Sequence, residues 1–221
     1  MSIAPSAYAT VRAEIERVPI ALVKSARGLG AATLHEAGGR IGALPHTIKP
    51  LIDAFTVCGP AVTVSGPAGD NLWLHRAIYM AQPGDVLVAY VSGGYGYGYW
   101  GDIMTTAARE RGLGGLVIDA CVRDGAVLRK AGFPIFSRGL ALRGTGKDFA
   151  ATGWINHCVL IGEITVAPGD LVVGDLDGVV VLPRERVGAI LEAAQAREAK
   201  EADVLQQLAS GARTLDIYGL N

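Results

Sequence analysis

Cysteine, clustered histidine and long apolar runs are scarce in this 221-residue sequence. The three cysteines, Cys58, Cys121 and Cys158, form no CxxC pair, which argues against a disulfide framework and against a structural zinc site. The four histidines form no HxxxH pair. No apolar stretch reaches the roughly 18 residues of a membrane span, and the first residues contain no run typical of a signal peptide. We therefore expect a cytoplasmic protein that does not enter a membrane.

An excess of charge of one sign is also absent. Lysine and arginine number 20 against 21 aspartates and glutamates, and no basic stripe stands out. Binding of nucleic acid by phosphate neutralisation is therefore not expected. The glycine run at residues 93–98 lacks GxGxxG spacing, and no GK[ST] or GxSxG motif occurs. Common nucleotide-binding and serine-nucleophile sites are accordingly disfavoured.

Glycine, by contrast, is abundant, and its 30 residues separate short runs rich in Val, Ile and Leu. This pattern is typical of many short strands joined by tight turns. Helices are predicted over residues 6–18, 31–37, 71–80, 102–112, 125–131 and 184–209, and residues 21–24 fit a strand or a helix end. Strands are predicted over residues 56–58, 61–64, 86–91, 115–120, 134–137, 158–161, 164–166, 171–174 and 179–182.

The order of these elements predicts a layered α/β fold with a mixed sheet or a partly closed barrel, because strands alternate with helices in the middle and cluster near the end. No linker or composition shift is visible, so residues 1–221 are interpreted as one domain. The helix at 184–209 is polar on all sides over much of its length, and such a helix often lies along a partner subunit.

A charged pair, Arg123-Asp124, follows the apolar strand predicted at residues 115–120. Ligands of open α/β sheets bind beyond the carboxyl ends of strands. A carboxylate there can hold Mg²⁺, with water completing the octahedron, and the guanidinium can bind a carboxylate or a developing enolate. The alternative is a surface ion pair, and the pair alone leaves both interpretations open.

Two further side chains lie near predicted helix starts. Asp102 begins the helix predicted at 102–112, whose N-terminal amides favour an anionic ligand such as a carboxylate; its other interpretation is an N-cap. His75 lies on the helix predicted at 71–80. It is either an acid/base or substrate contact, or a hydrogen-bonded packing residue.

Gly101-Asp102, followed after twenty residues by Arg123-Asp124, resembles the signature of the 4-hydroxy-4-methyl-2-oxoglutarate/4-carboxy-4-hydroxy-2-oxoadipate aldolases. These class II pyruvate aldolases belong to the wider group that includes the regulator of ribonuclease E activity. The resemblance covers nearly the whole chain. It includes residues 33–37, 59–64, 69–71 with His75, 83–86, 100–102, 119–124, 132–134, 168–170 and 177–181.

The resemblance implies a ββα fold similar to the phosphohistidine swivelling domain, with a long C-terminal helix. It also implies a homotrimer or a homohexamer built as a dimer of trimers, with the active site between subunits. The expected partner is a small-molecule oxoacid substrate, and the expected cofactor is Mg²⁺ or Mn²⁺.

The resemblance also implies roles for residues around the charged pair. Asp124 would bind the metal ion directly, and Asp102 would hold metal-bound waters. Arg123 would contact the keto oxygen and stabilise the pyruvate enolate. The backbone amides of Ile103 and Met104, after Gly101, would receive the pyruvyl carboxylate.

Two more residues are implied beyond that core. His75 would lie near the substrate. A glutamate on the C-terminal helix of the neighbouring subunit would complete the water shell, and Glu201 is our choice, with Glu198 second. The sequence departs from the family in having Asp102 where many relatives have Glu, and in its tyrosine-rich run at residues 95–99. Either departure could shift substrate preference.

The implied reaction is divalent-metal-dependent retro-aldol cleavage of 4-hydroxy-2-oxoacids through a pyruvate enolate. 4-Carboxy-4-hydroxy-2-oxoadipate would give pyruvate and oxaloacetate, and 4-hydroxy-4-methyl-2-oxoglutarate would give pyruvate. Oxaloacetate decarboxylation passes through the same enolate and is expected as a side activity. The alternatives are a dedicated oxaloacetate decarboxylase or other enolate-forming lyase, and a non-catalytic binding protein of the ribonuclease-regulator type. Asp102 argues against the last, because a regulator needs no water-holding acid there.

Overall fold

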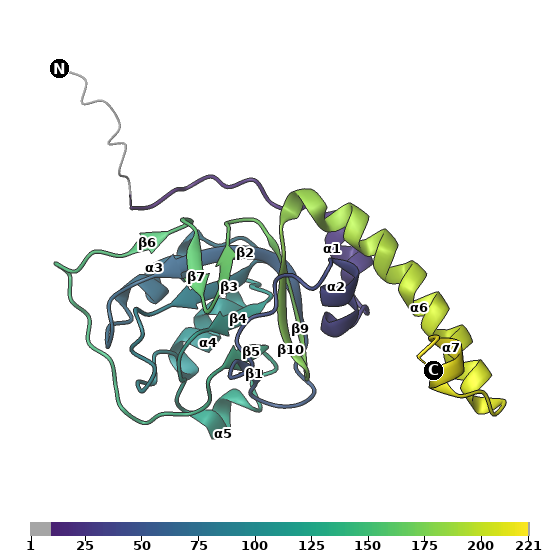
Figure 1. Cartoon of the computed structure of the whole chain (residues 1–221). Coiled ribbons are helices and arrows are strands. Elements are labelled where there is room, and N and C mark those ends of the chain that lie inside the picture. The colour runs from purple at the N-terminus through teal and green to yellow at the C-terminus, as the bar shows by residue number, and fades with distance from the viewer. Residues whose placement is uncertain (1–9, 221) are drawn as a thin grey trace, which may run out of the picture.

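The computed structural model describes residues 10–220, which build one large mixed sheet and a two-stranded sheet (Figure 1). The large sheet contains β1 (Lys49–Pro50), β2 (Val57–Ser65), β3 (Val86–Tyr90), β4 (Gly115–Ile118), β5 (Ile135–Ser137), β6 (Trp154–Ile155), β9 (Leu171–Asp175) and β10 (Gly178–Leu182). Its strand order is β1-β5-β4-β3-β2-β9-β10, with β6 also paired to β2. The small sheet pairs β7 (Val159–Ile161) with β8 (Ile164–Val166).

Strands β2, β3, β4 and β5 run parallel to one another. Their connections carry α3 (Leu72–Met80), α4 (Asp102–Glu110) and α5 (Gly125–Leu128). Parallel strands need such crossovers to return the chain to the starting edge. The carboxyl ends of all four strands therefore lie at one edge of the sheet, with the loops that follow them.

Strand β2 joins the parallel half of the sheet to its antiparallel half. Residues 57–60 pair with β9, whereas residues 61–65 pair with β3. Strands β1 and β10, at the two ends of the strand path, contact each other. The sheet is therefore a nearly closed barrel, which confirms the predicted layered α/β fold with a mixed sheet.

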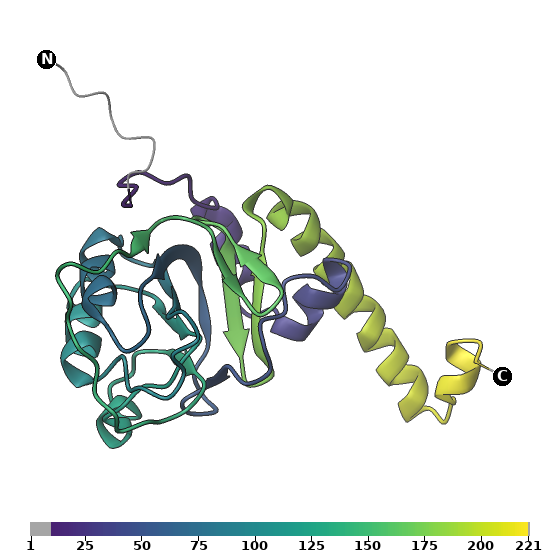
Figure 2. The same cartoon turned by 60° about the vertical axis from the view of Figure 1, so that its left-hand side comes forward.

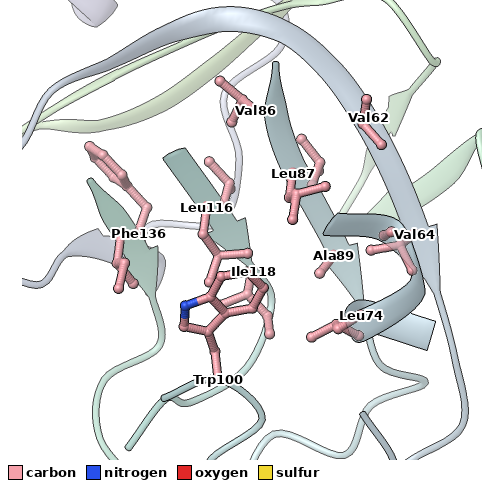
Figure 3. Packing of buried hydrophobic residues seen from close by; sticks show 14 of the residues in the cluster. Val62, Val64, Leu74, Val86, Leu87, Ala89, Trp100, Leu116, Ile118 and Phe136 are labelled. Carbon is pink, nitrogen blue, oxygen red and sulfur yellow. The ribbon is translucent and has the colours of Figure 1, made fainter. Parts of the chain in front are cut away.

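The central strands are buried apolar runs, as expected for parallel strands covered on both faces. Every residue of β4 is buried, and so are the first four residues of β3. Figure 3 shows Leu87, Leu116 and Ile118 of these strands packed with Trp100 and Phe136. The ring of Trp100 also stacks on Phe133, with centroids 6.3 Å apart. This core anchors the loop that leads into α4.

A second core lies between β9–β10 and three helices, α1 (Ile20–Ala26), α2 (Ala31–Ala37) and α6 (Val187–Ala209). The 3-10 turn η1 (Arg184–Arg186) precedes α6, and α7 (Thr214–Ile217) follows it. The buried residues of α6 are Val187, Ile190, Leu191, Ala194 and Val204. Its C-terminal half extends away from the sheet (Figures 1 and 2).

Most predicted elements are confirmed within one to three residues, and residues 21–24 belong to helix α1. The strands predicted separately at 56–58 and 61–64 are one continuous strand, β2, and the short strands β1 and β6 were not predicted. The helix predicted at 6–18 is wrong for residues 10–18, and residues 6–9 lie outside the described residues. This segment is extended because its backbone pairs with the sheet. Arg12 N donates to Ile155 O, and Val18 N donates to Gly169 O. Among residues 10–220, no helix is long and apolar enough to cross a membrane.

Candidate active site

A pocket of about 260 Å³ lies in the loops that follow the carboxyl ends of the parallel strands. It is lined by Asn71, His75, Tyr99, Gly101, Asp102, Ile103, Met104, Arg123, Asp124, Thr145 and Lys147. The structure therefore brings together seven of the eight predicted site residues, drawn from the loops and helices that follow β2, β3 and β4. Glu201 is the eighth and does not line this pocket.

The centre of the pocket is a close approach of two loops. The backbone N–H of Asp102 donates to Asp124 Oδ2 at 3.1 Å. Gly101 permits this approach because it has no side chain. An added Cβ would lie 3.3 Å from Asp124 Cγ and would overlap Asp124 Oδ2. The two halves of the predicted motif thus meet in space, although twenty residues separate them in sequence.

The backbone orients the charged pair. Asp124 has a left-handed conformation (φ 61°, ψ 33°) and precedes α5, whose Val127 and Leu128 amides donate to its carbonyl. Arg123 N donates to the carbonyl of the buried Trp100 at 2.8 Å. Arg123 Nε lies 4.0 Å from Asp124 Oδ2, and the two side chains are 50% and 43% exposed. The backbone of both residues is therefore held in place, while their side chains remain accessible to a ligand.

Asp102 is the first residue of α4, and Gly101 is the N-cap, so the N-cap interpretation of Asp102 is wrong. Asp102 is exposed and lines the pocket. Ile103 and Met104 belong to the first turn, where backbone N–H groups have no acceptor within the helix. This helix start can therefore receive a carboxylate.

His75 and Lys147 line the pocket together. The pKa of His75 is lowered from 6.5, mainly by burial and then by the positive charge of Lys147, while Asp70 opposes the shift. His75 is therefore neutral at pH 7 and can donate or accept a proton in a hydrogen bond. His75 is partly buried, so both of its predicted roles, substrate contact and packing, stay predictions.

Four pocket residues escaped the sequence analysis as site residues: Asn71, Tyr99, Thr145 and Lys147. Asn71 Nδ2 donates to the carbonyl of Tyr99 at 2.9 Å, and its buried Oδ1 has no partner among the described residues. Asn71 does fall within the 69–71 motif, which could have marked it. Thr145 and Lys147 lie in an irregular segment with no pattern to single them out.

Glu201 lies on the extending half of α6, where Arg197 Nε contacts its Oε1 at 2.8 Å. Arg197 also lies 3.6 Å from Glu36 of α2. The side chain of Glu201 is 46% exposed. Within one chain it thus belongs to a surface network on α2 and α6, and a role at the pocket requires a neighbouring subunit.

The donor set at the pocket suits a hard divalent cation. Asp124 and Asp102 offer accessible carboxylate oxygens at its edge, with Asn71 Oδ1 as a buried orphan acceptor in the lining. Mg²⁺ and Mn²⁺ prefer oxygen ligands, and Mg²⁺ is commonly held by one or two carboxylates while it keeps several waters. Among residues 10–220 no cluster of three or more His, Cys, Asp or Glu side chains forms a closed cage. The residues fit a water-rich cation site.

Comparison with known proteins defines the class to which this fold and pocket belong. The family described as RraA-like, Aldolase/RraA, matches residues 22–181. A Halalkalibacterium halodurans protein named "Putative 4-hydroxy-4-methyl-2-oxoglutarate aldolase" is 38% identical over 158 residues, which are 72% of this chain and 74% of that protein.

Solved structures agree with that assignment. An uncharacterized protein from Pseudomonas syringae pv. tomato has a TM-score of 0.82 and 28% identity, over 94% of this chain and 97% of its own. Streptomyces coelicolor RraAS2, described as an unusual member of the RNase ES inhibitor RraA protein family, has a TM-score of 0.76 and 31% identity, over 86% and 98%. The chain belongs to the RraA-like, Aldolase/RraA family.

Proposed function

We propose that this protein is a divalent-metal-dependent pyruvate aldolase that cleaves 4-hydroxy-2-oxoacids, with oxaloacetate decarboxylation as a side activity. The observation that carries the proposal is the convergence of Gly101, Asp102, Arg123 and Asp124 in one pocket with an open helix N-terminus. The similarity to a protein named as an aldolase supports it. The expected substrates are 4-carboxy-4-hydroxy-2-oxoadipate and 4-hydroxy-4-methyl-2-oxoglutarate.

The charges of the pocket suit such substrates. Two carboxylates, of Asp102 and Asp124, balance the two cations of Arg123 and Lys147, and His75 is neutral at pH 7. A bound divalent cation would leave the pocket with a net charge of +2. This balance favours a di- or tricarboxylate over a neutral ligand.

Each lining group has a place in the retro-aldol step. Asp124 would hold Mg²⁺ or Mn²⁺, which when bound supplies Lewis acidity at the C2 ketone. The amides of Ile103 and Met104 would bind the C1 carboxylate. Arg123 would donate to the C2 oxygen as negative charge develops there during cleavage of the C3–C4 bond.

Proton transfer and distal recognition fall to the remaining groups. The Asp102 carboxylate would hydrogen-bond the water that takes the C4 hydroxyl proton. His75 and Lys147 would face the carboxylates beyond C4, since both line the pocket, His75 from α3 and Lys147 from the irregular segment that contains Thr145. Oxaloacetate loses CO₂ through the same pyruvate enolate, so the same groups serve the side activity.

Assembly with a second copy would complete this pocket. Ile103 is 81% exposed and Leu142 94% exposed beside it, and on the extending α6 Leu205 is 66% exposed. A homotrimer, or a homohexamer of two trimers, would cover such apolar side chains. It would also allow Glu201, or Glu198 in its place, to approach the water shell of a neighbour's cation.

The activity test is pyruvate release coupled to lactate dehydrogenase, with Mg²⁺, Mn²⁺ or EDTA. Asp124→Asn should lose at least about 100-fold in kcat/KM, whereas Asp53→Asn, an exposed aspartate outside the pocket, should match wild type. Pyruvate release that survives EDTA dialysis unchanged would contradict metal dependence. A comparison of kcat/KM for hydroxy-oxoacids and oxaloacetate separates an aldolase from a dedicated decarboxylase.

Subunit sharing has its own test. Neither Asp124→Asn nor Glu201→Gln should be active alone, but their co-expressed mixture should regain about a quarter of the wild-type rate, because a random assembly pairs intact residues from two chains at one site in four. If the mixture regained no activity, either both residues would serve the site of the same chain or Glu201 would have no part in the site.

The similarity to RraAS2 favours a second candidate, a ribonuclease-regulating binding protein without catalysis. That function predicts no pyruvate release from any of these substrates. It also predicts inhibition of a ribonuclease that is unaffected by Asp124→Asn.

A further inference from the structure

The segment at residues 143–148 brings Thr145 and Lys147 to the pocket, although it forms no helix or strand. Backbone hydrogen bonds hold it against two other loops. Gly98 N donates to Arg143 O at 2.8 Å, and Gly146 N donates to Gly69 O at 2.7 Å. Asp148 N donates to the buried Asp70 carboxylate. The position of Lys147 thus depends on how firmly this segment lies on its neighbours.

Tyr97 of the tyrosine-rich run links the same three pieces of chain through its side chain. The guanidinium carbon of Arg143 lies 4.2 Å from the centre of the Tyr97 ring. The ring also rests against Gly69, where an added Cβ would lie 3.1 Å from Tyr97 Cζ. Its neighbour Tyr99, 5.9 Å away between centroids, accepts a hydrogen bond from Gly69 N through its hydroxyl.

A second arginine–tyrosine pair involves the same tyrosine-rich run but contacts a different part of the chain. The guanidinium carbon of Arg138 lies 3.9 Å from the centre of the Tyr95 ring, but Arg138 is bonded to Asp119 and lies outside the 143–148 segment. Variants of Tyr95 and Tyr97 can therefore distinguish two effects. Loss of the Tyr95 contact loosens only the tyrosine-rich run, whereas loss of the Tyr97 contact also loosens the segment that carries Lys147.

We propose that Tyr97 and Arg143 are positioning residues that set substrate preference, because they hold Lys147 and Thr145 over the pocket. The preferred substrates are then oxoacids with an additional carboxylate beyond C4, which Lys147 meets as a point charge. This inference rests on the proposed aldolase function. It assigns a role to the tyrosine-rich run, which the reaction itself leaves unused.

The test compares a long substrate with a short one. Tyr97→Leu and Arg143→Met should each raise KM for 4-carboxy-4-hydroxy-2-oxoadipate by roughly 3- to 10-fold, in keeping with loss of a partly exposed cation–π contact, with kcat within twofold. Exchange of the methyl protons of pyruvate in D₂O should stay within twofold, because pyruvate has no distal carboxylate. Tyr97→Phe keeps the ring and should restore the wild-type KM.

Two controls make the result specific. Tyr95→Leu removes the matched contact with Arg138 and should leave KM unchanged. Arg143→Met combined with Lys147→Met should lose no more than Lys147→Met alone, because both changes remove the same interaction. Additive losses, or equal losses with pyruvate exchange, would overturn the proposal.

Hydrogen exchange of the backbone separates this proposal from the aldolase function. The amides of Gly146 and Asp148 should exchange at least threefold faster in Tyr97→Leu and Arg143→Met, and not in Tyr95→Leu. If wild-type protein releases no pyruvate, the aldolase proposal fails, and the substrate preference inferred here fails with it. Unchanged exchange at these amides, with wild-type activity present, would overturn the positioning role alone.

Discussion

Replacement of Gly101 by alanine tests the geometry of the pocket without disturbing the fold. Gly101 has extended backbone angles (φ −149°, ψ −163°) that any residue can adopt. The added Cβ would lie 3.3 Å from Asp124 Cγ and 3.5 Å from Arg123 Cγ, and closer still to Asp124 Oδ2. The carboxylate must therefore move by about 1 Å, which breaks its hydrogen bond from Asp102 N.

The expected loss of activity is much larger than the expected loss of stability. A shift of about 1 Å at a reacting centre can lower activity about 100-fold, or about 2.7 kcal/mol of transition-state stabilisation. The Asp124 side chain is 43% exposed, so a rotation away from its preferred rotamer costs only about 1 kcal/mol. The lower entropy of the unfolded alanine chain offsets part of that cost. Activity should collapse while the protein stays folded.

The assay pairs pyruvate release with Mn²⁺ titration by calorimetry and with thermal unfolding. Gly96→Ala is the control, because a Cβ there meets no atom within 4 Å. If Gly101→Ala kept its kcat/KM and Mn²⁺ affinity within twofold of wild type, the assignment of Asp124 as the metal ligand would be refuted.

The remaining predictions concern pH, stability and metal. The pKa of His75 in the folded protein lies below 6.5. As the pH falls from about 6.5, the unfolded chain therefore binds more protons than the folded protein, and the free energy of unfolding decreases. His75→Gln should flatten this acidic part of a plot of Tm against pH. Arg17 binds the buried Asp85 through two hydrogen bonds of 2.8 Å, and Arg17→Met should cost about 3 kcal/mol in urea unfolding by leaving that charge unpaired; an unchanged midpoint would refute this. Added Mn²⁺ should raise the Tm of wild type and not of Asp124→Asn.

Much of the fold follows from local patterns in the sequence. The runs at β3 and β4 are continuous and apolar because parallel strands are buried on both faces. Pro83-Gly84 marks the turn before β3, and Gly112 and Gly114 mark the turn before β4. The same kind of reasoning failed for residues 10–18, because an amphipathic pattern does not show whether a segment coils or lies extended along a sheet edge.

The candidate site was only partly visible in the sequence. Arg123-Asp124 could be placed at a strand end, and its spacing from Gly101-Asp102 pointed to a known family. Lys147 and Thr145 could not be found, because an irregular segment has no period that indicates which side chains face a pocket. The N-cap interpretation of Asp102 failed because the helix begins at Asp102 itself, one residue earlier than a cap at this position would require.

Local patterns in the sequence predicted most of the strands and helices, although not the short strands β1 and β6, and they also predicted the two charged motifs. Both kinds of feature depend on residues close together in the chain. It is the three-dimensional arrangement that brings Gly101 against Asp124, places Lys147 and His75 in the same pocket, and keeps Glu201 outside its own chain's pocket. These relations depend on how parallel strands return loops to one edge and on where α6 extends, and no local pattern of residues encodes such distances.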